Sequence, residues 1–185
     1  VNRHPNALYS QHLKNFIEEL ENKSLTFETE ETTIPQKPFA IKINYTNLNK
    51  IYVSVRSISK NVYQDIINKE YSDKLISKLY QSSVNVYTKT VNLPNDKDFN
   101  NHSVEEIFEG LEKGFYVVMI SSDQNFENTA AIRCYQKLTS THIAMTSGRQ
   151  DDGSYKIIVT HRETGKPIAN AKVTLYQYQY GQTKE

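Results

Sequence analysis

A short polar segment near the middle of the chain is the first candidate for chemistry. Asp96, Asp98 and Asn100 stand at every second position, as the first ligands of an EF-hand calcium loop do. Such a loop also needs Gly at its sixth position and Glu at its twelfth, where this chain has Asn101 and Ile107. These departures favour a polar loop whose carboxylates hold turns, so no metal is expected there.

Histidine and serine are the other residue types that commonly carry chemistry. The histidines are scattered along the chain as His4, His12, His102, His142 and His161. None has a ligand partner at the spacing of a helical zinc motif, and for His102 we expect a structural hydrogen bond. There is also no Gly-x-Ser-x-Gly elbow and no Gly-rich phosphate loop. We therefore predict no catalytic residues, no cofactor and no metal, with a hydrolytic triad of distant residues as the enzymatic alternative.

The single cysteine, Cys134, cannot form a disulfide within the chain. It lies in an alternating apolar segment with Ile132, which predicts a thiol packed in the core. A cysteine-poor chain fits the cytoplasm and equally fits many exported bacterial proteins.

Composition narrows the classes of partner. The chain has 185 residues, a hydrophobic fraction of 37% and a net charge of +1, with 13 Tyr and 7 Phe to supply buried area. Such a balanced charge argues against nucleic acid as the main partner. No apolar run approaches the roughly 18 residues of a membrane span. No signal peptide is visible at Val1, and the chain reads as a segment of a longer protein.

Hydrophobic periodicity indicates which elements must position these residues. Apolar residues recur at helical spacing over 6–22 and again over 61–82, the latter as a helix inserted between strands. Residues 39–45 and 51–55 alternate apolar with polar side chains around a turn at 47–50, which predicts a hairpin of two half-buried strands.

Two local signals lie in the following part of the chain. Ser103 and Glu106 form a capping-box pattern, which predicts a short helix that stops at Gly110. Residues 115–120 are apolar on both faces, so we predict a central strand. Because no βαβ alternation is present, the fold class predicted is a mainly β, antiparallel β-sandwich with an N-terminal helix and an inserted helix.

The predicted domain organisation has three parts. These are an N-terminal helical segment over 1–23, a sandwich over 24–147, and the first strands of a second, truncated domain over 153–185. The polar, Gly-flanked break at 147–153 sets the boundary. Near the end of the chain, one strand face would carry Tyr176, Tyr178 and Tyr180, an interaction surface or a face covered by a neighbouring domain.

Three stretches resemble macroglobulin domains of large α2-macroglobulin-like proteins of Gram-negative bacteria, over about residues 25–176. The first comprises Leu93-Pro94-Asn95-Asp96, His102-Ser103 and Leu111-Glu112-Lys113-Gly114-Phe115-Tyr116-Val117-Val118. The second, 139–145, is similar to a closing strand that leads into the next domain. The third, 159–173, is similar to the opening of that domain. Its Thr164-Gly165-Lys166-Pro167 also occurs in carboxypeptidase-regulatory-like and invasin-like modules.

The resemblance implies a non-enzymatic module of an exported protein, periplasmic or at the cell surface. Such parents are thought to entrap attacking endopeptidases, and the partners implied are neighbouring macroglobulin domains and, through the parent, target proteases. Many members carry a thioester, which needs Glu-Gln two and three positions after its Cys. Cys134 is followed by Tyr135-Gln136-Lys137, and no bait segment is identifiable. A carbohydrate-binding or adhesin-type sandwich of a surface protein is the alternative.

Overall fold

The computed structural model describes residues 9–67, 72–94 and 97–174. The chain divides into two compact units, residues 1–141 and 142–185.

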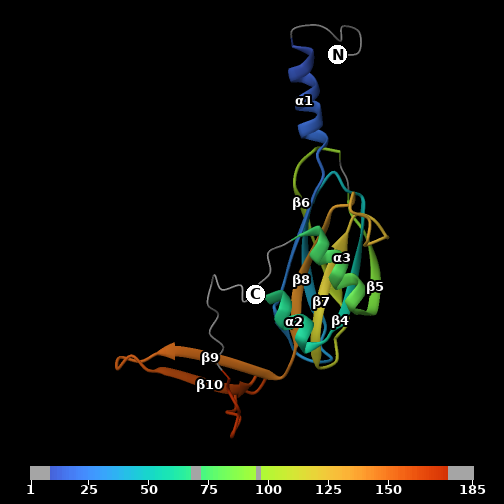
Figure 1. Cartoon of the computed structure of the whole chain (residues 1–185). Helices are drawn as coiled ribbons and strands as arrows, with labels where there is room; N and C mark the ends of the chain where they lie inside the picture. Colours follow the sequence, from blue (N-terminus) through green and yellow to red (C-terminus); the bar gives the residue numbers. More distant parts are fainter. Residues whose placement is uncertain (1–8, 68–71, 95–96, 175–185) are drawn as a thin grey trace, which may run out of the picture. The chain divides into compact units, whose positions relative to one another are not determined.

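The first unit contains two β-sheets (Figure 1). The smaller sheet is antiparallel, in the order β1-β3-β6. Its strands are β1 (Ser24–Thr29), β3 (Phe39–Thr46) and β6 (His102–Phe108). The larger sheet has the order β2-β8-β7-β4-β5 and is antiparallel except where β2 runs parallel to β8. Its strands are β2 (Thr32–Thr33), β8 (Arg133–Ser140), β7 (Gly114–Ser121), β4 (Lys50–Ile58) and β5 (Val84–Asn92).

The apolar core lies between these two sheets. Ile41 and Ile43 of β3 join Val53 and Val55 of β4 in one buried cluster, to which all the other long strands of both sheets contribute. The alternation of β3 produces this arrangement, because every second side chain is buried and the intervening ones are not. The fold is therefore the mainly antiparallel β-sandwich that the sequence predicts.

Strand β7 is central, as its apolar run predicts. It pairs with β4 on one side and β8 on the other. Val118 and Ile120 belong to the core between the sheets, whereas Val117 and Met119 belong to a second apolar cluster on the opposite face. Both faces of this strand are thus covered, which explains why its sequence does not alternate.

Helices cover that second face. The predicted insertion at 61–82 is two helices, α2 (Lys60–Ile67) and α3 (Asp73–Ser82), which lie over the larger sheet (Figure 1). The side chains buried there include Ile66, Ile76 and Leu79. Ser72 caps α3, because its Oγ accepts a hydrogen bond from the backbone N–H of Leu75 at 3.2 Å.

The N-terminal helix predicted over 6–22 is α1 (Ser10–Glu21) within the described residues. Its apolar stripe is uncovered, since Leu13, Phe16, Ile17 and Leu20 are all exposed. In the described part of the chain, no helix has both the length and the apolar character that crossing a membrane would require.

The hairpin predicted for residues 39–45 and 51–55 is wrong. Strands β3 and β4 both form, but they lie in different sheets, and β3 pairs with β1 and β6 instead. The short connection that contains Asn47, whose φ is +55°, carries the chain across the sandwich. Each of these two strands has one apolar face. When the strands lie in opposite sheets, their apolar faces cover each other, and this removes more apolar surface from water than pairing the strands within one sheet would.

The short helix predicted from the capping box is also wrong. Ser103 and Glu106 lie within β6, where Ser103 pairs with Asn44 and Glu106 pairs with Ile41. The strand places Phe108 in the core at 2% exposure. The local capping signal is overridden because the ladder with β3 satisfies the same backbone groups and also completes the smaller sheet.

The second unit is built on a two-stranded antiparallel sheet of β9 (Ile143–Arg149) and β10 (Tyr155–His161). The polar break at 147–153 is the end of β9 and the turn of this hairpin, and not a domain boundary. The predicted sandwich limit at residue 147 is therefore corrected to Thr141, because residues 143–147 pair with β10.

A chain shortened to end at Thr141 is expected to keep the stability of the first unit. Both buried apolar clusters consist of residues before Thr141, and the backbone N–H of Thr141 donates to the carbonyl of Thr33 at 3.0 Å. The free energy of unfolding in urea should change by less than about 0.5 kcal/mol. A loss above about 2 kcal/mol would assign the second unit to the same core.

Candidate functional site

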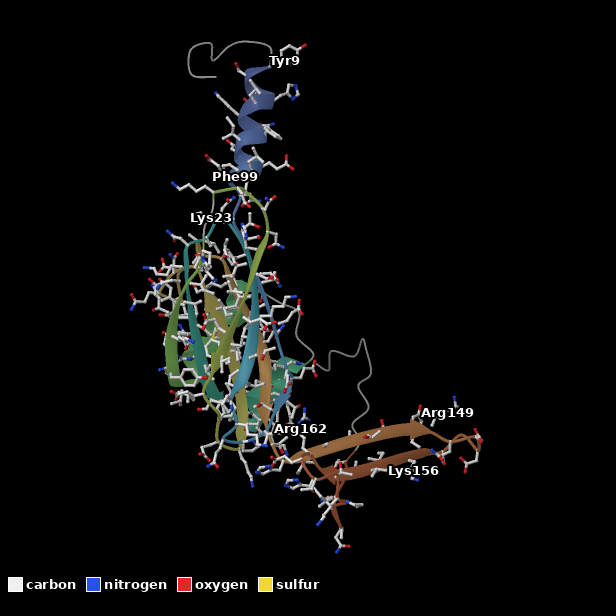
Figure 2. All side chains as sticks on the ribbon, turned by 180° about the vertical axis from the view of Figure 1, so that it is seen from behind. Tyr9, Lys23, Phe99, Arg149, Lys156 and Arg162 are labelled. Carbon is white, nitrogen blue, oxygen red and sulfur yellow. The ribbon has the colours of Figure 1, made fainter. Side chains whose placement is uncertain are left out.

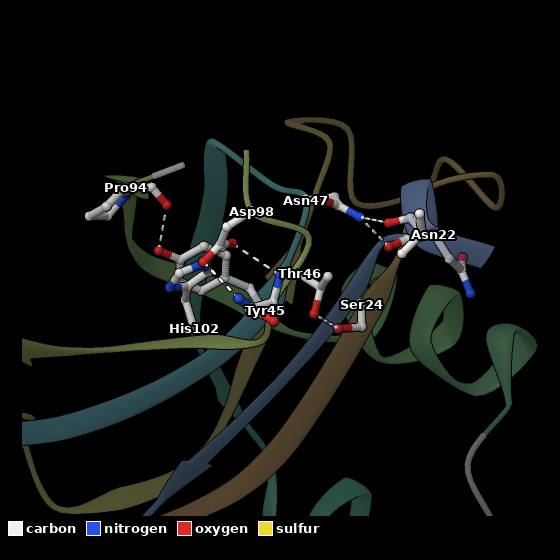
Figure 3. A network of polar contacts seen from close by, with 10 residues as sticks. Asn22, Ser24, Tyr45, Thr46, Asn47, Pro94, Asp98 and His102 are labelled. Carbon is white, nitrogen blue, oxygen red and sulfur yellow. Dashed lines mark hydrogen bonds and ion pairs between the residues drawn. The ribbon is translucent and has the colours of Figure 1, made fainter. Parts of the chain in front are cut away.

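The polar loop before β6 is organised around one carboxylate (Figure 3). Asp98 Oδ1 accepts a hydrogen bond from the backbone N–H of Asn100 at 3.0 Å and lies 2.8 Å from His102 Nε2. Its Oδ2 accepts from the Asn100 side-chain amide at 2.9 Å. These hydrogen bonds lower the pKa of Asp98, and the bond from the backbone N–H of Asn100 has the largest effect. Asp98 thus holds the turn as predicted, while Asp96 lies outside the described residues.

His102 makes the structural hydrogen bond that was predicted for it, but to Asp98 and at the start of a strand. The centroid of its ring also lies 5.8 Å from the ring centroid of Tyr45. The Tyr45 hydroxyl donates a hydrogen bond to the carbonyl of Pro94 at 2.6 Å. Nearby, the Asn47 side chain donates to the carbonyls of Leu20 and Asn22 at 2.7 and 2.8 Å (Figure 3). These contacts hold the loop before β6 and the C-terminal end of α1 in place, which is a structural role.

Cys134 is packed against the core between the sheets, as the sequence predicts. It pairs with Ile120 of β7, and its Sγ lies 4.0 Å from the carbonyl oxygen of that residue. Burial raises the pKa of the Cys134 thiol to about 12. The thiol is therefore protonated at neutral pH, and protonated thiols are poor nucleophiles.

Cys134 should react slowly with alkylating reagents while the protein is folded. The raised pKa lowers the thiolate population at pH 8, and burial limits access to Sγ, so the labelling rate should fall by more than about ten-fold. Iodoacetamide labelling followed by mass spectrometry should show this suppression in buffer, and denaturant should remove it. Labelling of the folded protein at the rate of the denatured chain would contradict the assignment to the core.

The tyrosine surface proposed from the sequence, Tyr176, Tyr178 and Tyr180, lies outside the described residues. The described part of the second unit presents an apolar groove. Its lining includes Ile143, Met145, Val159, Ile168 and Val173. Ile143 and Met145 are 53% and 61% exposed, so one face of the hairpin is largely uncovered.

The structure also brings together three residues that sequence reasoning did not combine: His142, His161 and Glu163. The two imidazole rings stack with their centroids 5.1 Å apart and their planes 14° apart. Glu163 Oε2 lies 3.6 Å from His142 Nδ1. No spacing motif could reveal this group, because the pairing of β9 with β10 places His161 opposite Ile143 and so beside His142.

Comparisons with known proteins give little further information. No protein-family model matches the chain, and no curated protein matches it. Among solved structures, the chain is similar to a CARDB domain from Pyrococcus furiosus, which was crystallised in complex with di-metal ions. The identity is 8%, the TM-score is 0.36, and the match covers 65% of this chain and 88% of that one. A likeness at this level carries no argument about function.

Proposed function

We propose that this chain is a structural and interaction module of a large exported α2-macroglobulin-like protein, with no catalysis of its own. The parent would act as an endopeptidase inhibitor by entrapment in the periplasm or at the cell surface. The observation that carries the proposal is the second unit, a two-stranded sheet whose apolar face is open to solvent. An isolated hairpin is marginally stable in water, so such a face calls for further β-structure to cover it.

The turn after β10 supports this assignment. The family-like pattern Thr-Gly-Lys-Pro, residues 164–167, lies in the turn that begins after β10 ends at His161. Gly165 adopts a φ of +67° there, which glycine tolerates best. The backbone N–H of Ile168 then donates to the carbonyl of Val159 at 2.9 Å, which returns the chain along β10. This is how the opening of a further sandwich domain would begin, as the resemblance over 159–173 implies.

The partners proposed for the chain are neighbouring domains of the same parent. Two apolar surfaces would accept them: the groove of the second unit and the uncovered stripe of α1 that includes Phe16 and Ile17. Burying such side chains contributes roughly 1.5–3 kcal/mol each, which is ample for contacts between domains of one chain.

Entrapment is tested on the intact parent protein. The parent is incubated with endopeptidases, and the remaining activity is measured on a protein substrate and on a small peptide substrate. Entrapment predicts that activity on the protein substrate is lost while activity on the small peptide persists. Loss of both activities would indicate an ordinary active-site inhibitor, and loss of neither would contradict inhibition. The present chain alone should inhibit neither reaction.

The alternative is a carbohydrate-binding or adhesin-type sandwich, for which the exposed aromatic and apolar side chains of the second unit would serve as a stacking platform. This alternative is tested on the chain itself by binding to a panel of bacterial and host glycans. Saturable binding to one glycan class, together with no protease retention by the parent, would replace the macroglobulin proposal.

A further inference from the structure

One end of the β9–β10 hairpin gathers side chains that suit a metal ion. One ring nitrogen each of His142 and His161 and one carboxylate oxygen of Glu163 all lie within 4.8 Å of one another. The backbone fixes their neighbourhood, because the N–H of Arg162 donates to the carbonyl of His142 at 2.6 Å. Figure 2 shows Arg162 at the end of the hairpin away from Arg149, so the group lies opposite the turn.

One nitrogen of each imidazole in this group lacks a hydrogen bond. The Nδ1 atoms of His142 and His161 are both buried from solvent and have no hydrogen-bond partner. Leaving a buried polar atom without a partner costs roughly 1–3 kcal/mol, so two such atoms side by side call for an explanation. His142 Nδ1 also lies 3.6 Å from Glu163 Oε2, just beyond hydrogen-bonding distance. A cation bound between the two rings would give these two nitrogens a partner.

We propose that His142, His161 and Glu163 bind one divalent transition-metal ion, with Zn²⁺ as the best match. Two imidazoles and one carboxylate form a mixed nitrogen and oxygen ligand set that Zn²⁺ accepts at distances of about 2.0–2.2 Å. With both imidazoles neutral, the carboxylate also offsets half of the ion's charge. Calcium and magnesium fit less well because they favour oxygen ligands alone.

Binding requires a small rearrangement. A metal lies in the plane of each imidazole that binds it, and two rings only 14° from parallel cannot both point at one ion between them. Rotation of one ring about its Cβ–Cγ bond, a broad torsion, removes this obstacle. The side chains of His142 and Glu163 are 32% and 30% exposed, so the ion can enter from solvent and water can complete its coordination.

The bound ion would cross-link the start of β9 to the turn after β10. The hairpin has only two strands, and the bound ion would hold those two strands together at their open end. A ligand that binds only the folded form stabilises that form by mass action. The metal is therefore assigned a structural role in the second unit, a property beyond the proposed module function.

The test is isothermal titration of the tag-free, full 185-residue chain with ZnCl₂. We expect one ion per chain. Loss of partners outside a ligand shell weakens metal binding by about 10–100-fold, so His142→Ala or His161→Ala should weaken it by at least about 100-fold. Glu163→Gln should weaken it by about ten-fold or more. The matched control is His12→Ala on α1, which should leave the titration unchanged, because His12 is exposed and belongs to the first unit.

A second measurement keeps the result interpretable if a variant loses its hairpin. In the unsubstituted chain, NMR of the histidine rings should show zinc-dependent shifts at His142 and His161 and none at His12. Absence of zinc binding would overturn the proposal, as would binding that His12→Ala weakens equally. A spectrum in which His142 is simply protonated and paired with Glu163, with no response to zinc, would replace the metal site with an ion pair.

Discussion

A Val117→Asp chain is expected to lose several kcal/mol of folding free energy. Val117 is fully buried, in the apolar cluster that also contains Ile76 and Met119, between the larger sheet and the two helices. An aspartate at this position would bring a charge out of water into that cluster, and even beside the paired residues Arg56 and Lys137 this desolvation costs about 3 kcal/mol of folding free energy. Since small domains are stable by only about 5–15 kcal/mol, this single change removes much of the total.

Urea denaturation followed by circular dichroism measures this effect. The matched control is Val84→Asp, which makes the same change on a strand of the same sheet at a position 70% exposed. The control should alter the free energy of unfolding by about 0.5 kcal/mol or less. If Val117→Asp stayed within about 1 kcal/mol of the unsubstituted protein, the central position of β7 would be wrong.

A Gly110→Ala chain should lose about 3 kcal/mol of folding free energy, because of steric overlap with backbone atoms. A Cβ at this position would lie 2.3 Å from the carbonyl carbon of Gln36 and 2.6 Å from the backbone nitrogen of Lys37. The backbone N–H of Gln36 donates to the carbonyl of Leu111 at 2.8 Å, so the two segments cannot separate without losing that bond.

The comparison for this variant is Gly148→Ala, where the added Cβ would meet nothing within 4 Å. That substitution should be neutral or slightly stabilising, because it mainly reduces the entropy of the unfolded chain. Urea denaturation of both variants isolates the effect of the steric overlap at Gly110, since the chemical change, glycine to alanine, is the same in both. Equal stability of the two variants would rule out the close approach of Gly110 to Gln36.

The sequence by itself determined the elements whose patterns reflect burial. The apolar run at 115–120 identified a strand covered on both faces, and alternation at 39–45 identified one buried face. Cys134 was correctly assigned to the core for the same reason. These inferences succeed because periodicity records which side of an element meets the core, whichever elements lie opposite.

Only the tertiary structure decided which strands pair and which side chains come into contact. Alternation is the same whether two strands pair or face each other, so β3 and β4 were wrongly joined in a hairpin. Residues 103–106 contain a genuine capping pattern, yet pairing with β3 makes them a strand. The His142, His161 and Glu163 group depends on strand register and on side-chain rotation, which residue spacing does not encode. Local signals therefore determined where chain segments are buried, while long-range pairing determined which side chains meet.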